Sequence, residues 1–451
     1  MRNTHLFFLA TLLAAAIYSC SQAPQLPRDN WNDSVYAALD ELIRSEGISS
    51  PDYDPQCRPY AVFDYDNTTI INDISLTLMI YQIENLNYAF SPDEAFERFT
   101  ANIPDIDCEL QGILPENWAP DGPKLKADRE DGRGWTAREL AQGLSDDFAV
   151  LMSMKADGMA LDEIRSSDCY LDFRARLLVL NEGVEHSFDY GIWCLWQPSL
   201  FFGMSWEELQ SFTRESVDHW LSFGPIRSEI WDSPDGSLSV EVRKGMALPQ
   251  ENIHLYKCLQ DNGFDVYICS ASLEKIVEAM ACDPKYGLNI PPENVFGIRL
   301  ADEQICYGEL APDYDQTYQS GKTACIRKLI APSHCGRQPS LIAGDSNGDY
   351  PMLSDFDSLR LGLIIDCKRS GPIARLAAEA RAAASAGVSS ATDSGAPAGD
   401  SPATDSGAPA WVSSATDSGT PAGVSGASAV RYVVQDRDLS IPGFVRSASV
   451  D

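Results

Sequence analysis

Two aspartates that stand two residues apart, Asp64 and Asp66 in the segment FDYDNT, are the residues best suited to chemistry. A carboxylate at Asp64 can attack phosphorus, and a carboxylic acid at Asp66 can protonate a leaving alkoxide and then activate water. Thr68, in the same segment, adds a hydroxyl for phosphoryl oxygens. The pattern alone is weak evidence, because a turn with aspartate-to-backbone hydrogen bonds has a similar sequence.

Later segments supply the other groups that such chemistry needs. Ser270, after the run VYIC, offers a hydroxyl to a transferring phosphoryl group, and Lys322 in SGKTA can neutralise charge shared by nucleophile and phosphate. Asp345 and Asp349 in IAGDSNGD are hard oxygen ligands of the kind that magnesium takes. Singly, Ser270 could end a strand, Lys322 could be solvated and Asp349 could cap a helix. Their order behind FDYDNT favours the functional interpretation.

Short apolar runs that end in these polar segments predict the elements that hold them. The runs indicate buried strands with exposed carboxyl ends, and they alternate with helical patterns, as in a mostly parallel α/β sheet. A sheet of this kind presents its ligand site at the carboxyl ends of its strands. The predicted strands are 60–63, 266–269, 340–343 and 361–365, and the predicted helices are 31–43, 251–261 and 351–356.

The stretch from about residue 73 to residue 243 interrupts this alternation and predicts an inserted cap domain. It contains helical patterns, many aromatic residues and a loop-like segment at 115–134. Trp193, Trp196 and Trp206 can form the packed core of this cap, or part of an aromatic cage for a quaternary ammonium such as choline.

Acidic residues of the cap allow two interpretations as well. They can add attraction for a cation, or they can simply lie on the surface of a very acidic protein. The residues concerned are Glu182, Glu185 and Asp189.

The segments FDYDNT, ICSAS, SGKTA and IAGDSNGD occur in the order found in phosphatases of the haloacid dehalogenase superfamily, which this chain closely resembles. The resemblance covers the predicted core. It implies an α/β fold with a Rossmann-like, mostly parallel sheet flanked by helices. A large, mainly helical cap would be inserted after the first strand.

The resemblance also implies Mg²⁺ as cofactor and a role for each motif residue. In the catalytic set, Asp64 would be the nucleophile, Asp66 the general acid and base, and Lys322 the charge-neutralising base. The remaining expectations are that Thr68 and Ser270 bind phosphate, that Asp345 binds the metal with Asp64 and the Asp66 carbonyl, and that Asp349 supports the metal site.

The acid two residues after the nucleophile argues against dehalogenation, because it marks the phosphatases and phosphomutases of the superfamily. The cap between the first and second motifs resembles that of the phosphoserine phosphatase and phosphorylcholine phosphatase branch. We therefore expect a magnesium-dependent hydrolase of small phosphorylated metabolites, such as phosphoserine or phosphorylcholine, that acts through an aspartyl-phosphate. A phosphotransferase or phosphomutase, and a catalytically silent binding lipoprotein on the cell surface, are the alternatives.

Net charge excludes one class of partner. The 66 acidic and 34 basic residues leave a formal charge of -32, which repels a nucleic acid backbone. The same field repels phosphate esters, so a phosphate site must create its own positive potential from a metal, a lysine or backbone amides.

The N-terminal residues predict export from the cytoplasm. One arginine, an apolar run from Leu6 to Tyr18, then Ser19 and Cys20 form a signal peptide. Its end resembles a lipobox, although Tyr18 fits that pattern poorly, so Cys20 is expected to carry a lipid anchor on a periplasmic or cell-surface protein; the alternative is a simple cleaved signal peptide in which Cys20 has no role. The 12 cysteines form no dense framework, and Cys258 and Cys269 lie in apolar runs typical of a core.

Composition changes abruptly near the C-terminus, where ATDSG recurs from Ala391, Ala403 and Ala415. Such a segment buries too little apolar surface to order itself, and a strand at 431–435 follows it. The expected division is 1–20 signal peptide, 21–73 first helix and strand, 74–243 cap, 244–385 hydrolase core, 386–429 disordered insertion, and 430–451 final strand and tail.

Overall fold

A computed structural model describes residues 24–111, 125–127, 132–301, 309–392 and 431–446. The predicted signal peptide with Cys20 lies outside the described residues, and so does nearly all of the predicted disordered insertion. The first residues of that insertion, 386–392, form the end of a long helix, α14 (Pro372–Thr392). Within the described part of the chain, no helix is both long and apolar enough to cross a membrane.

A seven-stranded sheet forms the centre of the protein, in the order β10-β9-β8-β7-β1-β5-β6. All neighbouring strands run parallel except β10 and β9, which pair antiparallel. The predicted Rossmann-like α/β class is therefore confirmed. The strands are β1 (Tyr60–Phe63), β5 (Asp265–Leu273), β6 (Val295–Ile298), β7 (Leu341–Gly344), β8 (Leu361–Asp366), β9 (Arg431–Arg437) and β10 (Phe444–Val445).

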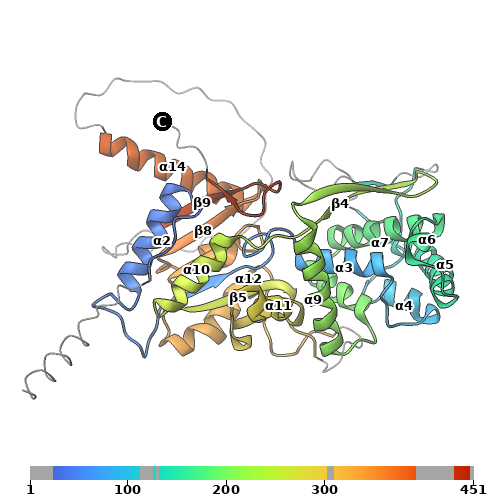
Figure 1. The fold of residues 1–451 in the computed structure, drawn as a ribbon, viewed down its shortest axis with the longest axis horizontal. Helices are drawn as coiled ribbons and strands as arrows, with labels where there is room; N and C mark the ends of the chain where they lie inside the picture. The colour runs from blue at the N-terminus through green and yellow to red at the C-terminus, as the bar shows by residue number, and fades with distance from the viewer. Residues whose placement is uncertain (1–23, 112–124, 128–131, 302–308, 393–430, 447–451) are drawn as a thin grey trace, which may run out of the picture.

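Alternation along β1 shows why this sheet is buried on both faces. Ala61 and Phe63 point into one apolar cluster and Tyr60 and Val62 into another, as the two-residue period of a strand requires. Helices cover each face (Figure 1). The first cluster includes residues of α2 (Asp33–Glu46), α10 (Gln250–Asp261) and α11 (Glu274–Ala281), and the second includes residues of α12 (Ser320–Cys325), α13 (Tyr350–Ser354) and α14.

The insertion after β1 lies to one side of the sheet, with α3 (Ile74–Asn85) and α9 (Trp206–Phe223) at the junction (Figure 1). Its other helices are α4 (Ala95–Phe99), α5 (Ala137–Ala156), α6 (Leu161–Arg165), α7 (Asp168–Ser187) and α8 (Tyr190–Trp196), with short 3-10 turns at Pro92–Glu94 and Gln197–Phe201. It also holds an antiparallel sheet, β2-β4-β3, made of Leu125–Ala127, Leu238–Lys244 and Arg227–Asp232. Strand β2 lies inside the segment expected to be a loop, because pairing with β4 decides its conformation.

Candidate active site

Three neighbouring strands bring the motif residues together at one edge of the sheet. Asp64 directly follows β1, Asp345 directly follows β7, and Ser270 lies in the second half of β5. Since β1 pairs with β5 on one side and β7 on the other, Asp64 stands between the other two. Its backbone N–H donates to the Ala343 carbonyl at 2.9 Å, which extends the β1–β7 pairing up to the nucleophile position.

Local hydrogen bonds hold the turn that carries FDYDNT. Asn67 has a φ of 60°, a left-handed conformation that asparagine tolerates better than most residues. Arg437, from the far end of the chain, donates to its Oδ1 at 2.7 Å. The Thr69 hydroxyl donates to the Asp64 carbonyl at 2.6 Å, and Asn252 donates to the carbonyls of Thr68 and Thr69. The position of the Asp64 carboxylate is thus set by contacts with distant parts of the sequence.

Lys322 is buried and joins two of the predicted acids. Its Nζ donates to Asp64 Oδ1 and to Asp349 Oδ1, each at 2.6 Å, and the residue is 2% exposed. Burial lowers the pKa of Lys322, but the attraction of Asp349 and Asp64 outweighs it and raises that pKa overall. The ammonium therefore stays charged beside Asp64, where charge would build up during phosphoryl transfer.

The carboxylates of Asp64, Asp345 and Asp349 form a buried cluster with oxygens within 4.8 Å of one another. Burial first, and then the charge of Asp349, raises the pKa of Asp64 to about 8, and burial also raises the pKa of Asp345. Lys322 and Arg369, which lies 3.2 Å from Asp345 Oδ2, are the cations in contact with this cluster among the described residues. Oxygen ligands with excess negative charge fit a magnesium ion.

Asp349 is held more tightly than the other two acids, because both of its oxygens accept hydrogen bonds of 3.1 Å or less. Oδ1 accepts from Lys322, and Oδ2 accepts from the backbone N–H of Asp345 and of Ser346 and from the Ser346 hydroxyl, at 2.9 to 3.1 Å. A Cβ on Gly344 would lie 2.5 Å from the Cβ of Asp349, so the loop closes this tightly only with glycine there. The arrangement suits a residue that supports the metal site rather than one that binds the ion directly.

Asp66 is held at both of its carboxylate oxygens. Oδ1 accepts from the Ile74 backbone N–H at 2.7 Å, and Oδ2 accepts from the Ser272 hydroxyl at 2.7 Å. Burial, and then the charges of Asp73 and Asp64, raise the pKa of Asp66 well above its usual range. A raised pKa favours the protonated carboxyl, which is the form a general acid needs.

The two predicted phosphate ligands lie on either side of these acids. The Thr68 hydroxyl is buried and 3.4 Å from Asp345 Oδ1. The Ser270 hydroxyl is fully buried, 3.4 Å from Asp66 Oδ2, and accepts the Ser272 backbone N–H at 3.0 Å. All seven predicted site residues therefore meet at one edge of the sheet.

Two neighbours of the site, Arg369 and Ser272, were absent from the sequence prediction. Arg369 lies three residues beyond β8, and Ser272 lies two residues beyond Ser270. The rule that strand ends carry the ligand site could have drawn attention to Arg369. No pattern in the sequence singles out Ser272.

The predicted tryptophans of the cap have different surroundings. Trp196 is fully buried and donates to the Phe99 carbonyl, as expected of a cap core. Trp193 donates to Asn181 at 3.0 Å, and its ring lies 5.1 Å from that of Tyr190. Tyr190 in turn lies 5.5 Å from Tyr318 of the core, so these aromatic rings span the junction between cap and core. Trp206 is the first residue of α9 and is partly buried against the apolar cluster that contains Trp193 and Trp196.

Two of the predicted acidic residues are less exposed than surface residues would be. Glu182 is 8% exposed, and burial and the charge of Glu185 raise its pKa to about 8. Burial also raises the pKa of Glu185, and Asp73 beside Asp66 adds to both shifts. Asp189 is exposed and caps α8 by accepting from the Gly191 N–H.

Comparisons with known proteins found one partial sequence match. No family model matches the chain. Phosphorylcholine phosphatase of Pseudomonas aeruginosa is 30% identical over 177 residues, which cover 34% of this chain and 48% of that protein. The chain thus matches about half the length of this relative.

Two solved structures were also found to be similar. A conserved protein of unknown function from Anaerococcus prevotii has a TM-score of 0.72 at 25% identity, covering 94% of this chain and 97% of its own. A phosphoserine phosphohydrolase-like protein from Francisella tularensis has a TM-score of 0.27 at 15% identity, covering 68% and 87%. The parallel sheet and the four motifs at its carboxyl edge are the features in which this chain resembles phosphatases of the haloacid dehalogenase superfamily.

Proposed function

We propose that this protein hydrolyses small phosphomonoesters through an aspartyl-phosphate intermediate on Asp64. The observation that carries the proposal is the placement of Asp64, which stands at the end of β1, between β7 and β5, and 2.6 Å from the buried Lys322 ammonium. Asp66 lies two residues further along, with its carboxyl held from both sides. A nucleophile, an acid and a fixed positive charge are thus within one small site.

The proposed reaction has two steps. A carboxylate oxygen of Asp64 attacks phosphorus as the bond to the ester oxygen breaks, and Asp66 gives its proton to that leaving oxygen. A water molecule then attacks the phosphorus of the aspartyl-phosphate and passes a proton to Asp66, which frees phosphate and restores the Asp64 carboxylate. Lys322 stabilises negative charge in both steps without changing its own protonation.

Magnesium would be held by Asp64, Asp345 and the Asp66 carbonyl, with Asp349 supporting the loop. Bound there, it would neutralise charge on the phosphoryl group. Among the described residues, the three buried carboxylates of this cluster contact two cations, Lys322 and Arg369, and this excess of negative charge supports this part of the proposal.

We also propose that the substrate carries a cationic group, as phosphorylcholine and phosphoserine do. The name of the Pseudomonas relative supports this, and so does the junction between cap and core. There the aromatic rings of Tyr190, Trp193 and Tyr318 lie near each other, and Asn181, which accepts from Trp193, also donates to the buried Glu182. Aromatic faces and buried carboxylates attract an ammonium group.

Phosphate release from phosphorylcholine, phosphoserine and p-nitrophenyl phosphate, with and without magnesium, tests the proposal. We expect magnesium-dependent release, and a phosphoryl group on the peptide that contains Asp64 when the reaction is quenched. Asp64→Asn should abolish both signals while the protein stays folded. Turnover by Asp64→Asn would contradict the mechanism, and an added alcohol that becomes phosphorylated would favour the phosphotransferase alternative.

Glu182→Gln separates the substrate hypothesis from the mechanism. Above pH 8, where Glu182 with its pKa of about 8 is charged, the substitution removes a negative charge but keeps an oxygen for the Asn181 amide, which donates to Glu182 at 3.2 Å; the assays are therefore run at pH 8.5. We expect a raised KM for phosphorylcholine and an unchanged KM for p-nitrophenyl phosphate. Equal changes for both esters would refute a cation site at this position.

Export and lipid anchoring at Cys20 remain part of the proposal, supported by the signal-like N-terminus. The disulfide between Cys57 and Cys335 is also in keeping with an oxidising compartment. Incorporation of a labelled fatty acid into the wild type, and its loss in Cys20→Ser, is the expected result.

A further inference from the structure

Two serines link the first turn of the cap to the general acid. Ser272 Oγ donates to Asp66 Oδ2 at 2.7 Å, and Ser75 Oγ donates to Ser272 Oγ at 2.9 Å. Both serines are buried, with exposed fractions of 8% and 7%. Ser272 belongs to β5 of the core, whereas Ser75 belongs to α3, the first helix of the cap.

The direction of these hydrogen bonds is determined by the number of protons. A serine hydroxyl has one proton, so a Ser272 that donates to Asp66 can only accept from Ser75. Ser75 thereby removes the other rotamers of the Ser272 hydroxyl. The alternative donor to Asp66 Oδ2 is Ser270 at 3.4 Å, a longer and weaker contact.

The same turn of α3 also contacts the other oxygen of Asp66, through the backbone N–H of Ile74 at 2.7 Å. The Asp73 side chain caps this turn by accepting from the Leu76 N–H at 2.8 Å. One helical turn of the cap therefore fixes both oxygens of the Asp66 carboxyl, one directly and one through Ser272.

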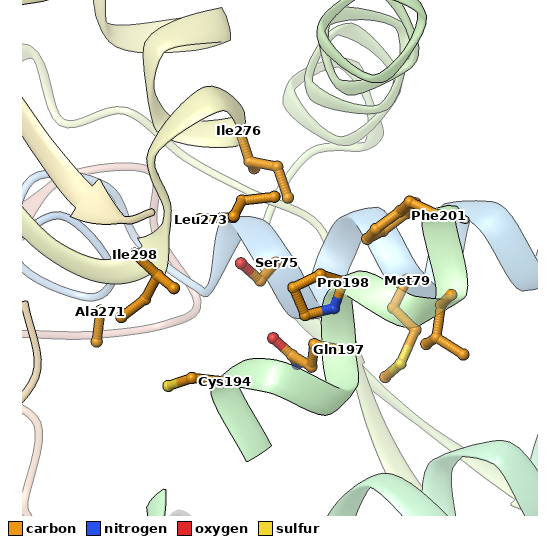
Figure 2. A pocket seen from close by; sticks show the side chains of 11 residues that line it. Ser75, Met79, Cys194, Gln197, Pro198, Phe201, Ala271, Leu273, Ile276 and Ile298 are labelled. Atoms are coloured by element: carbon orange, nitrogen blue, oxygen red, sulfur yellow. The ribbon is translucent and has the colours of Figure 1, made fainter. Parts of the chain in front are cut away.

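Packing around Ser75 favours a hydrogen bond within the protein. Figure 2 shows the Ser75 side chain among residues of the cap, such as Pro198 and Met79, and residues of the core, such as Leu273 and Ile298. These neighbours line a small, mostly apolar cavity at the junction. A hydroxyl in apolar surroundings must find its partner within the protein, because leaving it unpaired is costly.

We propose that Ser272, held by Ser75, is a positioning residue that aims the Asp66 carboxyl at the leaving-group oxygen, so that the cap's first turn sets the efficiency of proton donation. The inference rests on the proposed function. It predicts which substrates depend on Ser272. Alkyl esters need a proton on the departing alkoxide, whereas p-nitrophenolate is a stable anion that leaves without one.

The test compares kcat/KM for phosphorylcholine or phosphoserine with kcat/KM for p-nitrophenyl phosphate, using the full chain. General acid catalysis contributes about 100-fold or more, so misaiming Asp66 should cost a substantial part of it. We expect Ser272→Ala to reduce kcat/KM for the alkyl ester about tenfold or more, and for the aryl ester less than about threefold. Ser75→Ala should shift the ratio in the same direction by a smaller factor, and Ser272→Thr, which keeps the hydroxyl, should restore it.

Ser340→Ala is the matched control. Ser340 is also a buried serine with a side-chain hydrogen bond to a carboxylate, Glu46, but it lies at the opposite edge of the sheet. Its substitution should leave the alkyl-to-aryl ratio unchanged. An equal loss for both esters in Ser272→Ala, or no loss, would overturn the positioning role while the active wild type upholds the proposed function. A wild type inactive on every ester would overturn both.

Discussion

Replacing Lys322 by methionine keeps an apolar stem of similar length and removes the ammonium that joins Asp64 and Asp349. Both Nζ to oxygen distances are 2.6 Å, and the lysine side chain is 3% exposed. After the change Asp349 retains three donors at Oδ2, but Asp64 Oδ1 loses its hydrogen bond. The variant therefore leaves a buried carboxylate without its cation.

Breaking a buried ion pair from one side costs about 3–5 kcal/mol in free energy of unfolding. The pKa of Asp64 is about 8 even with Lys322 present, so at low pH this carboxyl is neutral in the folded protein. Between pH 4 and pH 8 the folded protein therefore keeps a proton on Asp64 that the unfolded chain has lost. The contribution of Asp64 to stability falls as the pH rises through this window. Without Lys322 the pKa of Asp64 rises further, so the loss in Lys322→Met should be larger near pH 8 than near pH 5, where Asp64 is neutral and the contact with Asp349 is the main one lost.

Urea unfolding of wild type and variant at both pH values, without magnesium, measures this loss. Lys328→Met is the control, because Lys328 forms an exposed pair with Asp315 at 2.6 Å, and such pairs contribute at most about 1 kcal/mol. Phosphate release by Lys322→Met should also fall by about 100-fold or more. A variant as stable as Lys328→Met at pH 8, or a loss independent of pH, would refute the electrostatic account of this site.

Three further predictions concern the metal, the cap and the disulfide. Magnesium should raise the thermal midpoint of wild type, because an ion that binds only the folded state stabilises that state. The Asp345→Asn variant should show no such rise. An equal rise in the variant would place the ion elsewhere. Glu182→Gln should raise the thermal midpoint by about 2 °C or more at pH 8.5 but not at pH 5. The pKa of Glu182 is about 8, so its burial destabilises the protein only at a pH where the carboxyl is charged. A higher midpoint of the variant at pH 5 would contradict this reasoning. The disulfide between Cys57 and Cys335 closes a loop of 278 residues, so the double variant Cys57→Ser/Cys335→Ser should be less stable than wild type by about 2–5 kcal/mol. Reductant should lower the stability of wild type but not that of the double variant. Equal stability of the two proteins would show that the bond contributes nothing.

Several elements were predictable from local sequence because parallel strands are buried on both faces. The runs at 60–63, 266–269, 340–343 and 361–365 are continuously apolar or nearly so, and each of them, like the more polar run at 431–435, lies in or overlaps a strand of the sheet. The helices predicted at 31–43 and 251–261 match α2 and α10, and Cys258 and Cys269 are buried as expected. The short strands β6 and β10 were missed, since four and two residues carry little periodic signal.

Local sequence also explains why the predicted site residues could be recognised as parts of one site. Each motif directly follows, lies within or neighbours an apolar run, and the carboxyl ends of parallel strands share one edge of a sheet. The types of chemical group at that edge, two aspartates with a lysine and further acids, follow from four short segments.

Tertiary structure decided what joins these groups to each other and to the cap. Ser75 and Ser272 are 197 residues apart, Lys322 reaches Asp64 across 258, and Arg437 reaches Asn67 across 370. The burial that turns Glu182 from a surface acid into a group with a pKa of about 8 depends on how the cap packs. Local patterns report the preferences of neighbouring residues in the chain, whereas hydrogen-bond partners, burial and the resulting pKa values depend on which distant segments come to lie side by side.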